Sequence, residues 1–155
     1  MEISIINLNE SHARSISKLI SPLVEKYIFP TIDISMRHIL LDSMSTENIE
    51  KYLASDYQYI GAFNEKSEIV GVAAIRGGTH LYHLFVRDDY QGNGLSRQLW
   101  QQIKYEVIDE KHPGRFTVNS SVNAESVYLK LGFQRMDGIR NRNGMVDIPM
   151  VLEPA

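Results

Sequence analysis

A glycine-rich segment, Gln91-Gly92-Asn93-Gly94, stands directly before residues with helical periodicity. Apolar residues recur there at every fourth position, at Leu95, Leu99, Ile103 and Val107, which predicts an amphipathic helix. The start of a helix presents unpaired backbone N–H groups and the positive end of the helix dipole, and glycine lets a ligand approach the main chain closely. The segment therefore predicts a site for an anion, with phosphate the best-suited group.

The residues that follow this segment and the spacing of its glycines exclude several other interpretations. Asn93-Gly94 is also a hairpin dipeptide, but the helix that follows excludes a returning strand. The GxxxxGK[ST] pattern is absent, and the GxGxxG fingerprint does not fit because Arg97 stands where its third glycine belongs. These spacings exclude P-loop nucleotide hydrolysis and dinucleotide-dependent hydride transfer. A tight strand-to-helix turn without a ligand stays open.

A phenol further along the chain is the second candidate for chemistry. Tyr128 has a reference pKa near 10, so it carries a proton at neutral pH and can donate it to a thiolate. It also belongs to a stripe of residues at helical spacing, formed with Ala124, Val127 and Leu131. The stripe by itself favours a tyrosine buried in the core over a catalytic one. The sequence motif around Tyr128 decides between the two interpretations.

Two blocks of the sequence resemble the GCN5-related N-acetyltransferases (GNAT). Leu84-Phe85-Val86 followed by Gln91-Gly92-Asn93-Gly94-Leu95-Ser96 is similar to the acyl-CoA signature Q/R-x-x-G-x-G/A of that family. Asn123-Ala124 followed by the segment 127–133 is similar to the family's second block in its Asn, its Tyr and its Lys-Leu-Gly-Phe. The order of strands and helices resembles this fold over nearly the whole chain, although the first ~55 residues match in pattern only.

The resemblance implies acetyl-CoA as co-substrate and transfer of an acetyl group to a primary amine on a small molecule or a protein. No metal is expected, because His12, His38 and His112 show no metal-ligand spacing. The resemblance also implies that backbone N–H groups hold the diphosphate, that the pantetheine arm lies along the central strand, where a strand N–H meets the oxyanion, and that Tyr128 is the general acid. Asn123 either bonds the pantetheine arm or the substrate, or caps its helix. The implied cofactor-binding residues are Leu84, Phe85, Val86, Gln91, Gly92, Asn93, Gly94, Leu95, Ser96, Arg97, Asn123 and Tyr128.

The base that removes the amine proton is left open. The stretch His80-Leu81-Tyr82 resembles a His-Leu-His stretch of arylalkylamine acetyltransferases that is linked to this step, so the resemblance makes His80 a catalytic candidate. Ordered water is the alternative, and a polar histidine at a strand edge is another interpretation. Strand alternation places His83 on the opposite face unless a bulge intervenes. Expected acceptor contacts are Tyr27, Phe29, Met36, His38 and Tyr82 with residues 140–145.

Two residues depart from the family pattern. Ser96 stands where Gly or Ala is usual, and its hydroxyl is able to add a donor to the phosphate site. Asp88 takes the place of a frequent proline, and Asp89 follows it. We expect both carboxylates to face solvent, as ordinary loop residues do.

The elements that must position these residues follow from periodicity and turn signals. Strands are predicted at 2–7, 57–63, 69–76, 80–86 and 115–120, with two more around the hairpin dipeptide Asn143-Gly144, the last closing at 148–150. Helices are predicted at 9–20, from Pro22 to 28 with Pro30 as a stop, from a Thr46 cap, from 94, and at 123–131. Residues 31–45 receive no assignment. The pattern predicts one α/β (α+β) domain over residues 1–155, with a mostly antiparallel mixed central sheet of about seven strands flanked by helices.

Composition narrows the classes of partner. The 155 residues carry 16 basic and 19 acidic side chains, a formal net charge of −3, which gives no basic field for nucleic acid or anionic lipid. There is no cysteine, no apolar run of about 20 residues, and no signal-peptide pattern, so we expect a cytoplasmic protein. A homodimer stays open. A non-catalytic acyl-CoA-binding or sensor domain, and a structural domain without a ligand, are the alternative functions.

Overall fold

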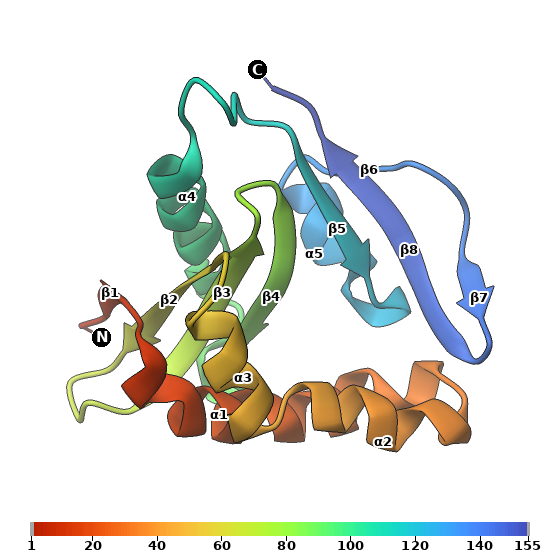
Figure 1. Ribbon diagram of the computed structural model, residues 1–155, viewed down its shortest axis with the longest axis horizontal. Coiled ribbons are helices and arrows are strands. Elements are labelled where there is room, and N and C mark those ends of the chain that lie inside the picture. The colour runs from red at the N-terminus through yellow and green to blue at the C-terminus, as the bar shows by residue number, and fades with distance from the viewer. Residues whose placement is uncertain (1, 155) are drawn as a thin grey trace.

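A computed structural model describes residues 2–154, in which eight strands form the central sheet (Figure 1). The strands are β1 (Ser4–Asn7), β2 (Tyr57–Phe63), β3 (Ile69–Arg76), β4 (His80–Val86), β5 (Phe116–Ser120), β6 (Gln134–Arg135), β7 (Arg140–Arg142) and β8 (Met145–Leu152). They lie in the order β1-β2-β3-β4-β5-β8-β6, and β7 also pairs with β8. Every pairing is antiparallel except that of β4 with β5. The mixed, mostly antiparallel sheet is confirmed, and the short β6 is the strand that the sequence did not predict.

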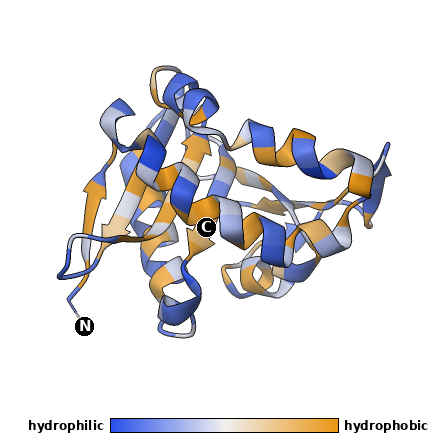
Figure 2. Ribbon diagram, turned by 90° about the horizontal axis from the view of Figure 1, so that it is seen from below, coloured by the Kyte–Doolittle hydropathy of each residue, from blue (hydrophilic) through white to orange (hydrophobic). Residues whose placement is uncertain are grey.

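Helices cover both faces of this sheet. They are α1 (Ala13–Tyr27), α2 (Ile34–Ser43), α3 (Thr46–Leu53), α4 (Leu95–Val107) and α5 (Glu125–Lys130). One apolar cluster joins α1 and α3 to one face, and a second joins α4 and α5 to the other. The view from below shows α1 and α2 with alternating hydrophilic and hydrophobic residues over more uniformly hydrophobic strands (Figure 2). None of the helices in residues 2–154 has the length and apolar character needed to cross a membrane.

The first long helix differs from its prediction. Separate helices were expected before and after Pro22, but α1 runs unbroken from Ala13 to Tyr27 with Pro22 inside it. Pro22 has no N–H to donate to the carbonyl four residues earlier, which weakens the helix at that point. Helical residues on both sides of it, Ile20 and Val24 among them, are fully buried against the sheet. Packing of one continuous apolar stripe therefore outweighs the missing hydrogen bond.

The region without a prediction contains α2. Its N-cap is Asp33, whose side chain accepts a hydrogen bond from the backbone N–H of Ser35. None of its residues is buried, so the sequence has no apolar stripe there to mark a helix. The following helix also begins one residue earlier than expected, because Ser45 and not Thr46 is the N-cap and accepts from the Asn48 N–H.

The hairpin that closes the chain agrees with its prediction. Asn143 and Gly144 have φ of 57° and 98°, and they connect β7 to β8. Two consecutive residues with positive φ form the turn whose twist matches that of paired strands, and Asn-Gly is the dipeptide that best tolerates it. The turn packs against the start of α2, where Asp33 N–H donates to the Gly144 carbonyl at 2.9 Å.

Candidate active site

A cleft of about 410 Å³ opens where β4 and β5 separate. The two strands pair only at His80 with Thr117 and at Leu81 with Val118, after which β5 stays with β8 and β4 stays with β3. Figure 1 shows α5 and the end of α1 at this gap. The cleft is lined by the end of β4, the glycine-rich loop, the start of α4, the α5 segment and the last turn of α1.

The edge of β4 along the cleft presents backbone N–H groups from which no carbonyl of residues 2–154 accepts a hydrogen bond. Arg87 N–H donates to the Val70 carbonyl of β3 at 2.8 Å. Because successive N–H groups of a strand point to opposite edges, those of Leu84 and Val86 point away from β3, toward the edge that β5 has left. Leu84 and Val86 both line the cleft. An extended ligand could therefore add to β4 as a further strand.

The glycine-rich loop presents its main chain at one end of this cleft. Gly92 and Gly94 have φ of 81° and 78°, a conformation in which an L side chain is strained. A Cβ at either position would meet no atom of the described residues within 4 Å, so the space beside the loop is open. Within residues 2–154 no backbone carbonyl accepts from the N–H groups of residues 92–97 at the start of α4. The loop has the donors, the helix dipole and the room that an anionic group requires.

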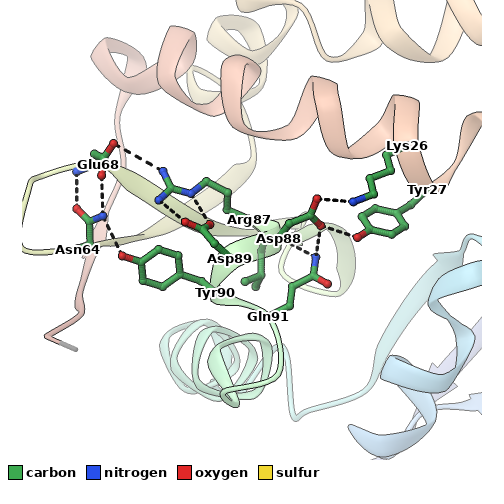
Figure 3. Close-up of polar contacts among 10 residues, drawn as sticks. Lys26, Tyr27, Asn64, Glu68, Arg87, Asp88, Asp89, Tyr90 and Gln91 are labelled. Carbon is green, nitrogen blue, oxygen red and sulfur yellow. Dashed lines mark hydrogen bonds and ion pairs between the residues drawn. The ribbon is translucent and has the colours of Figure 1, made fainter.

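The carboxylates of Asp88 and Asp89 before this loop are exposed, as expected, with 44% and 60% of their side chains accessible, but both also accept hydrogen bonds from neighbouring side chains. Figure 3 shows Asp88 accepting hydrogen bonds from Lys26 Nζ at 2.7 Å, from Tyr27 Oη, and from Gln91 Nε2 at 3.3 Å. The bond from Lys26 contributes most to holding the pKa of Asp88 below its usual range. Asp89 instead accepts two bonds from the Arg87 guanidinium, at 2.7 and 2.9 Å. Both negative charges are thus matched by cations.

Tyr128 lies on the opposite wall of the cleft, in α5, with 8% of its surface exposed. Burial raises the pKa of its phenol above the ordinary value, so the hydroxyl keeps its proton at neutral pH. Its ring packs edge-to-face on Phe133, with ring centroids 5.8 Å apart. Gly132 ends the helix with φ of 101°, as expected for a C′ residue, and it turns the chain so that Phe133 enters the core.

Asn123 neither caps a helix nor reaches the loop. It lies in the 3-10 turn η4 (Val122–Ala124), whose N-cap is Ser121, and its Nδ2 donates to the Tyr27 carbonyl at 2.8 Å. Asn123 and Tyr27 both line the cleft. Of the interpretations left open for Asn123, helix capping is wrong in this structure, and its amide links the α5 wall to α1.

The histidines and the tyrosine of β4 lie outside the lining of the cleft. His80 Nδ1 is 2.8 Å from Thr117 Oγ1, and burial, with a smaller contribution from Arg76, lowers the pKa of His80 to about 4. The register changes from His83 opposite Ala74 to Leu81 opposite Ile75, so Tyr82 is the extra residue of a bulge. The bulge removes the expected alternation.

The bulge places two aromatic side chains on the same face of the sheet. The rings of Tyr82 and His83 lie 4.5 Å apart on the side of α1 and α3, and His83 Nδ1 is 3.1 Å from Tyr59 Oη. His83 is 3% exposed, and burial lowers its pKa to about 3, so the imidazole is neutral at pH 7. Tyr82 packs edge-to-face on Tyr52 and Tyr57.

The expected acceptor contacts are only partly brought together. Tyr27 lines the cleft, whereas Phe29, Met36, His38 and Tyr82 are not among its lining residues. Phe29 instead accepts a hydrogen bond at its carbonyl from Arg37, and His38 is exposed on α2. The hairpin segment 140–145 packs against the start of α2, outside the lining.

Several lining residues were not predicted. The wall on the α1 side includes Leu23 and Ile28, and the helical spacing of Leu23 and Tyr27 was the signal available for it. The remaining unpredicted lining residues come from the ends of β4 and β5 and from α5, and they are Tyr90, Ser121, Ala124, Val127, Lys130 and Leu131. No cluster of three or more His, Asp or Glu side chains in the described part of the chain is arranged to hold a metal ion.

Comparison with known families identifies this architecture. A model of the acetyltransferase (GNAT) domain matches residues 31–154. The chain belongs to the GNAT acetyltransferase family. A search of curated protein sequences found no match for this acetyltransferase.

Solved structures of the same fold have very different sequences. The PaiA N-acetyltransferase of Thermoplasma acidophilum, solved with coenzyme A, is 15% identical with a TM-score of 0.79, and the match covers 99% of each chain. A GCN5-related N-acetyltransferase of Rhodopseudomonas palustris is 15% identical with a TM-score of 0.81, over 98% of this chain and 96% of that one. An aminoglycoside 6′-N-acetyltransferase complexed with coenzyme A is 19% identical with a TM-score of 0.67, over 97% and 96%. At these identities the likeness establishes the fold.

Proposed function

We propose that this protein transfers an acetyl group from acetyl-CoA to the primary amine of a small molecule or an exposed protein amino group. One observation carries the proposal: the exposed loop, the free edge of β4 and the Tyr128 ring all line one cleft. Family membership and two structural relatives solved with coenzyme A support it.

The residues of the cleft fit coenzyme A. The N–H groups of residues 92–97 would hold the diphosphate, since they have no backbone acceptor within the described chain and the space beside Gly92 and Gly94 is open. The backbone N–H groups of Leu84 and Val86, on the free edge of β4, would bind the pantetheine arm as if it were an added strand. When bound, acetyl-CoA supplies an acetyl group activated as a thioester.

Two groups of the chain would act on charge that develops during transfer. The N–H of Leu84 or Val86 on the free edge would donate to the oxyanion of the tetrahedral state. Tyr128 would donate its phenolic proton to the departing sulfur. Burial keeps that proton on Tyr128 Oη until a thiolate forms beside it.

The proton of the amine would leave through water. His80 lies at the far end of β4 and is engaged with Thr117, and its imidazole has a pKa lowered to about 4, which makes it a weak base. Many amines need only a modest fall in pKa to lose a proton near neutral pH. Ordered water in the cleft is therefore the proton acceptor that we propose.

Binding is tested first, by thermal unfolding with and without acetyl-CoA. At a hundredfold excess over Kd, a ligand of the folded state adds about 2.7 kcal/mol to the free energy of unfolding. For a chain of this size that raises Tm by about 5–10 °C. An unchanged Tm at millimolar acetyl-CoA would contradict the proposal and favour a structural domain without a ligand.

Turnover is tested next, by thiol release across a panel of small amines and amino-terminal peptides. Tyr128→Phe should lower kcat about a hundredfold or more while the affinity for acetyl-CoA stays within about twofold. Tyr105→Phe is the matched control, because Tyr105 is 83% exposed on α4 and does not line the cleft, and the substitution removes the same hydroxyl. Equal kcat in Tyr128→Phe and wild type would remove Tyr128 from its role. Binding without turnover on any amine would instead assign a non-catalytic acyl-CoA sensor.

A further inference from the structure

Asp88 connects the end of α1, which lies 61 and 62 residues earlier in the sequence, to β4 and the glycine-rich loop on either side of it. It follows β4 and precedes the glycine-rich loop, and its carboxylate accepts from two consecutive residues at the end of α1, Lys26 and Tyr27 (Figure 3). The same Oδ1 atom that accepts from Tyr27 also accepts from Gln91 Nε2, the side chain that opens the loop. Gln91 Nε2 in turn donates to the Val86 carbonyl at 2.9 Å. One carboxylate thus ties α1 to both the strand and the loop.

Tyr27 extends this connection across the cleft. Its hydroxyl is bound by Asp88 on the loop side, and its carbonyl accepts from Asn123 on the α5 side. Tyr27 is the last residue of α1 and lines the cleft between these two contacts. The end of α1 is therefore hydrogen-bonded to the loop side and to the α5 side of the cleft. A shift of the loop would displace Tyr27 through Asp88.

We propose that Asp88 is a positioning residue that couples the phosphate-binding loop to the α1 wall of the cleft, so that binding of the coenzyme diphosphate orders the surface on which the acceptor amine docks. This inference rests on the proposed function. The bound diphosphate restrains the loop, Gln91 and Asp88 transmit the restraint, and Tyr27 receives it.

The coupling belongs to Asp88 and not to negative charge near the loop. Asp89 carries the same charge one residue later, but its two bonds go to Arg87, which with Glu68 lies on the side of β3. The backbone at Asp88 does not require an aspartate: Arg87 has φ of −57° and ψ of 143°, which allows a proline to follow, as the family pattern often has. A proline would keep the loop and lose the connection to α1.

Hydrogen exchange with coenzyme A as the probe tests the proposal without an identified acceptor. In the wild-type protein, saturating coenzyme A should slow amide exchange in residues 91–97 and also in the last turn of α1, residues 24–28. In Asp88→Ala and in Tyr27→Phe, protection of the loop should persist while the added protection of α1 falls by about fivefold, the factor that corresponds to one net hydrogen bond. Asp88→Asn keeps an oxygen for the Tyr27 hydroxyl and should rescue most of it.

Two control variants separate coupling from general damage. Asp89→Ala removes an equal charge, and Tyr105→Phe removes the hydroxyl of a tyrosine that is 83% exposed on α4 and does not line the cleft; both should behave as wild type. Protection of α1 that survives in Asp88→Ala, which loses the contacts with both Lys26 and Tyr27, would overturn the coupling, because it would show that the ligand shields α1 directly. Protection of the loop alone in wild type would overturn it too and leave the proposed function standing. No protection anywhere in wild type would refute the proposed function itself.

Discussion

Lowering the pH from 8 to 5 should destabilise this protein through one buried imidazole. His83 is 3% exposed between Tyr59 and Phe85, and its pKa in the folded chain is about 3. In the unfolded chain its pKa returns to about 6.5, so below that pH the unfolded state binds a proton that the folded state excludes. The free energy of unfolding therefore falls as the pH falls through this window.

The size of the effect follows from the two pKa values. At pH 5 the unfolded imidazole is protonated about 30-fold over its neutral form while the folded one is neutral, which lowers the free energy of unfolding by about 2 kcal/mol relative to pH 8. At pH 6.5 the same arithmetic gives about 0.4 kcal/mol. The loss continues at about 1.4 kcal/mol per pH unit until the folded pKa is reached.

Urea unfolding at pH 8, 6.5 and 5 measures this loss against a variant. His83→Asn keeps a side-chain oxygen in the place of Nδ1 for the Tyr59 hydroxyl but cannot titrate. His80 also has a lowered pKa, as do several carboxylates, and their contributions are common to both proteins and cancel in the difference. Wild type should lose about 2 kcal/mol more than His83→Asn between pH 8 and 5. A difference that does not change with pH would mean that folded His83 takes up protons freely, and the buried placement would be wrong.

Two glycine substitutions probe the cleft and the core behind it. Gly94→Val should abolish coenzyme A binding measured by calorimetry, because a β-branched residue disfavours φ of 78° and its side chain fills the open space beside the loop, whereas Gly138→Val, with equally open space and an ordinary φ, should leave binding unchanged. Gly71→Val should lower the free energy of urea unfolding by about 1–3 kcal/mol, because even a Cβ at Gly71 lies 2.9 Å from Leu99 Cδ1; wild-type stability would show that α4 does not pack closely on β3.

The elements that carry the cofactor loop could be predicted because their signals are local. The apolar residues that recur at every fourth position from Leu95 form the buried face of α4, where Leu99 and Ile103 are fully buried. The glycines before it have the positive φ that their type allows. A short stretch of chain therefore encodes strand end, turn and helix start together, and the prediction needed no knowledge of the remaining sequence.

The contacts made by Asp88 could not be predicted, since its partners Lys26 and Tyr27 lie 62 and 61 residues earlier in the chain. A single sequence gives no sign that such a carboxylate is engaged. The continuity of α1 was missed for a related reason: the local rule for Pro22 is correct, but the burial that overrides it comes from the sheet. Similarly, α2 buries no residue, so its sequence has no helical periodicity of apolar residues that would predict it.

The bulge in β4 explains why the site cannot be read from alternation. Leu81 and Leu84 pack toward the same cluster, on the face of α4 and α5, although they are three residues apart. In a regular strand, two residues three positions apart point to opposite faces of the sheet. The extra residue Tyr82 shifts the alternation by one position, so that Leu81 and Leu84 share a face and His83 points to the α1 face. The bulge comes directly after the last pair of β4 with β5, Leu81 with Val118. One inserted residue thus lies where the strands part and sets which side chains of β4 face the cleft beyond that point.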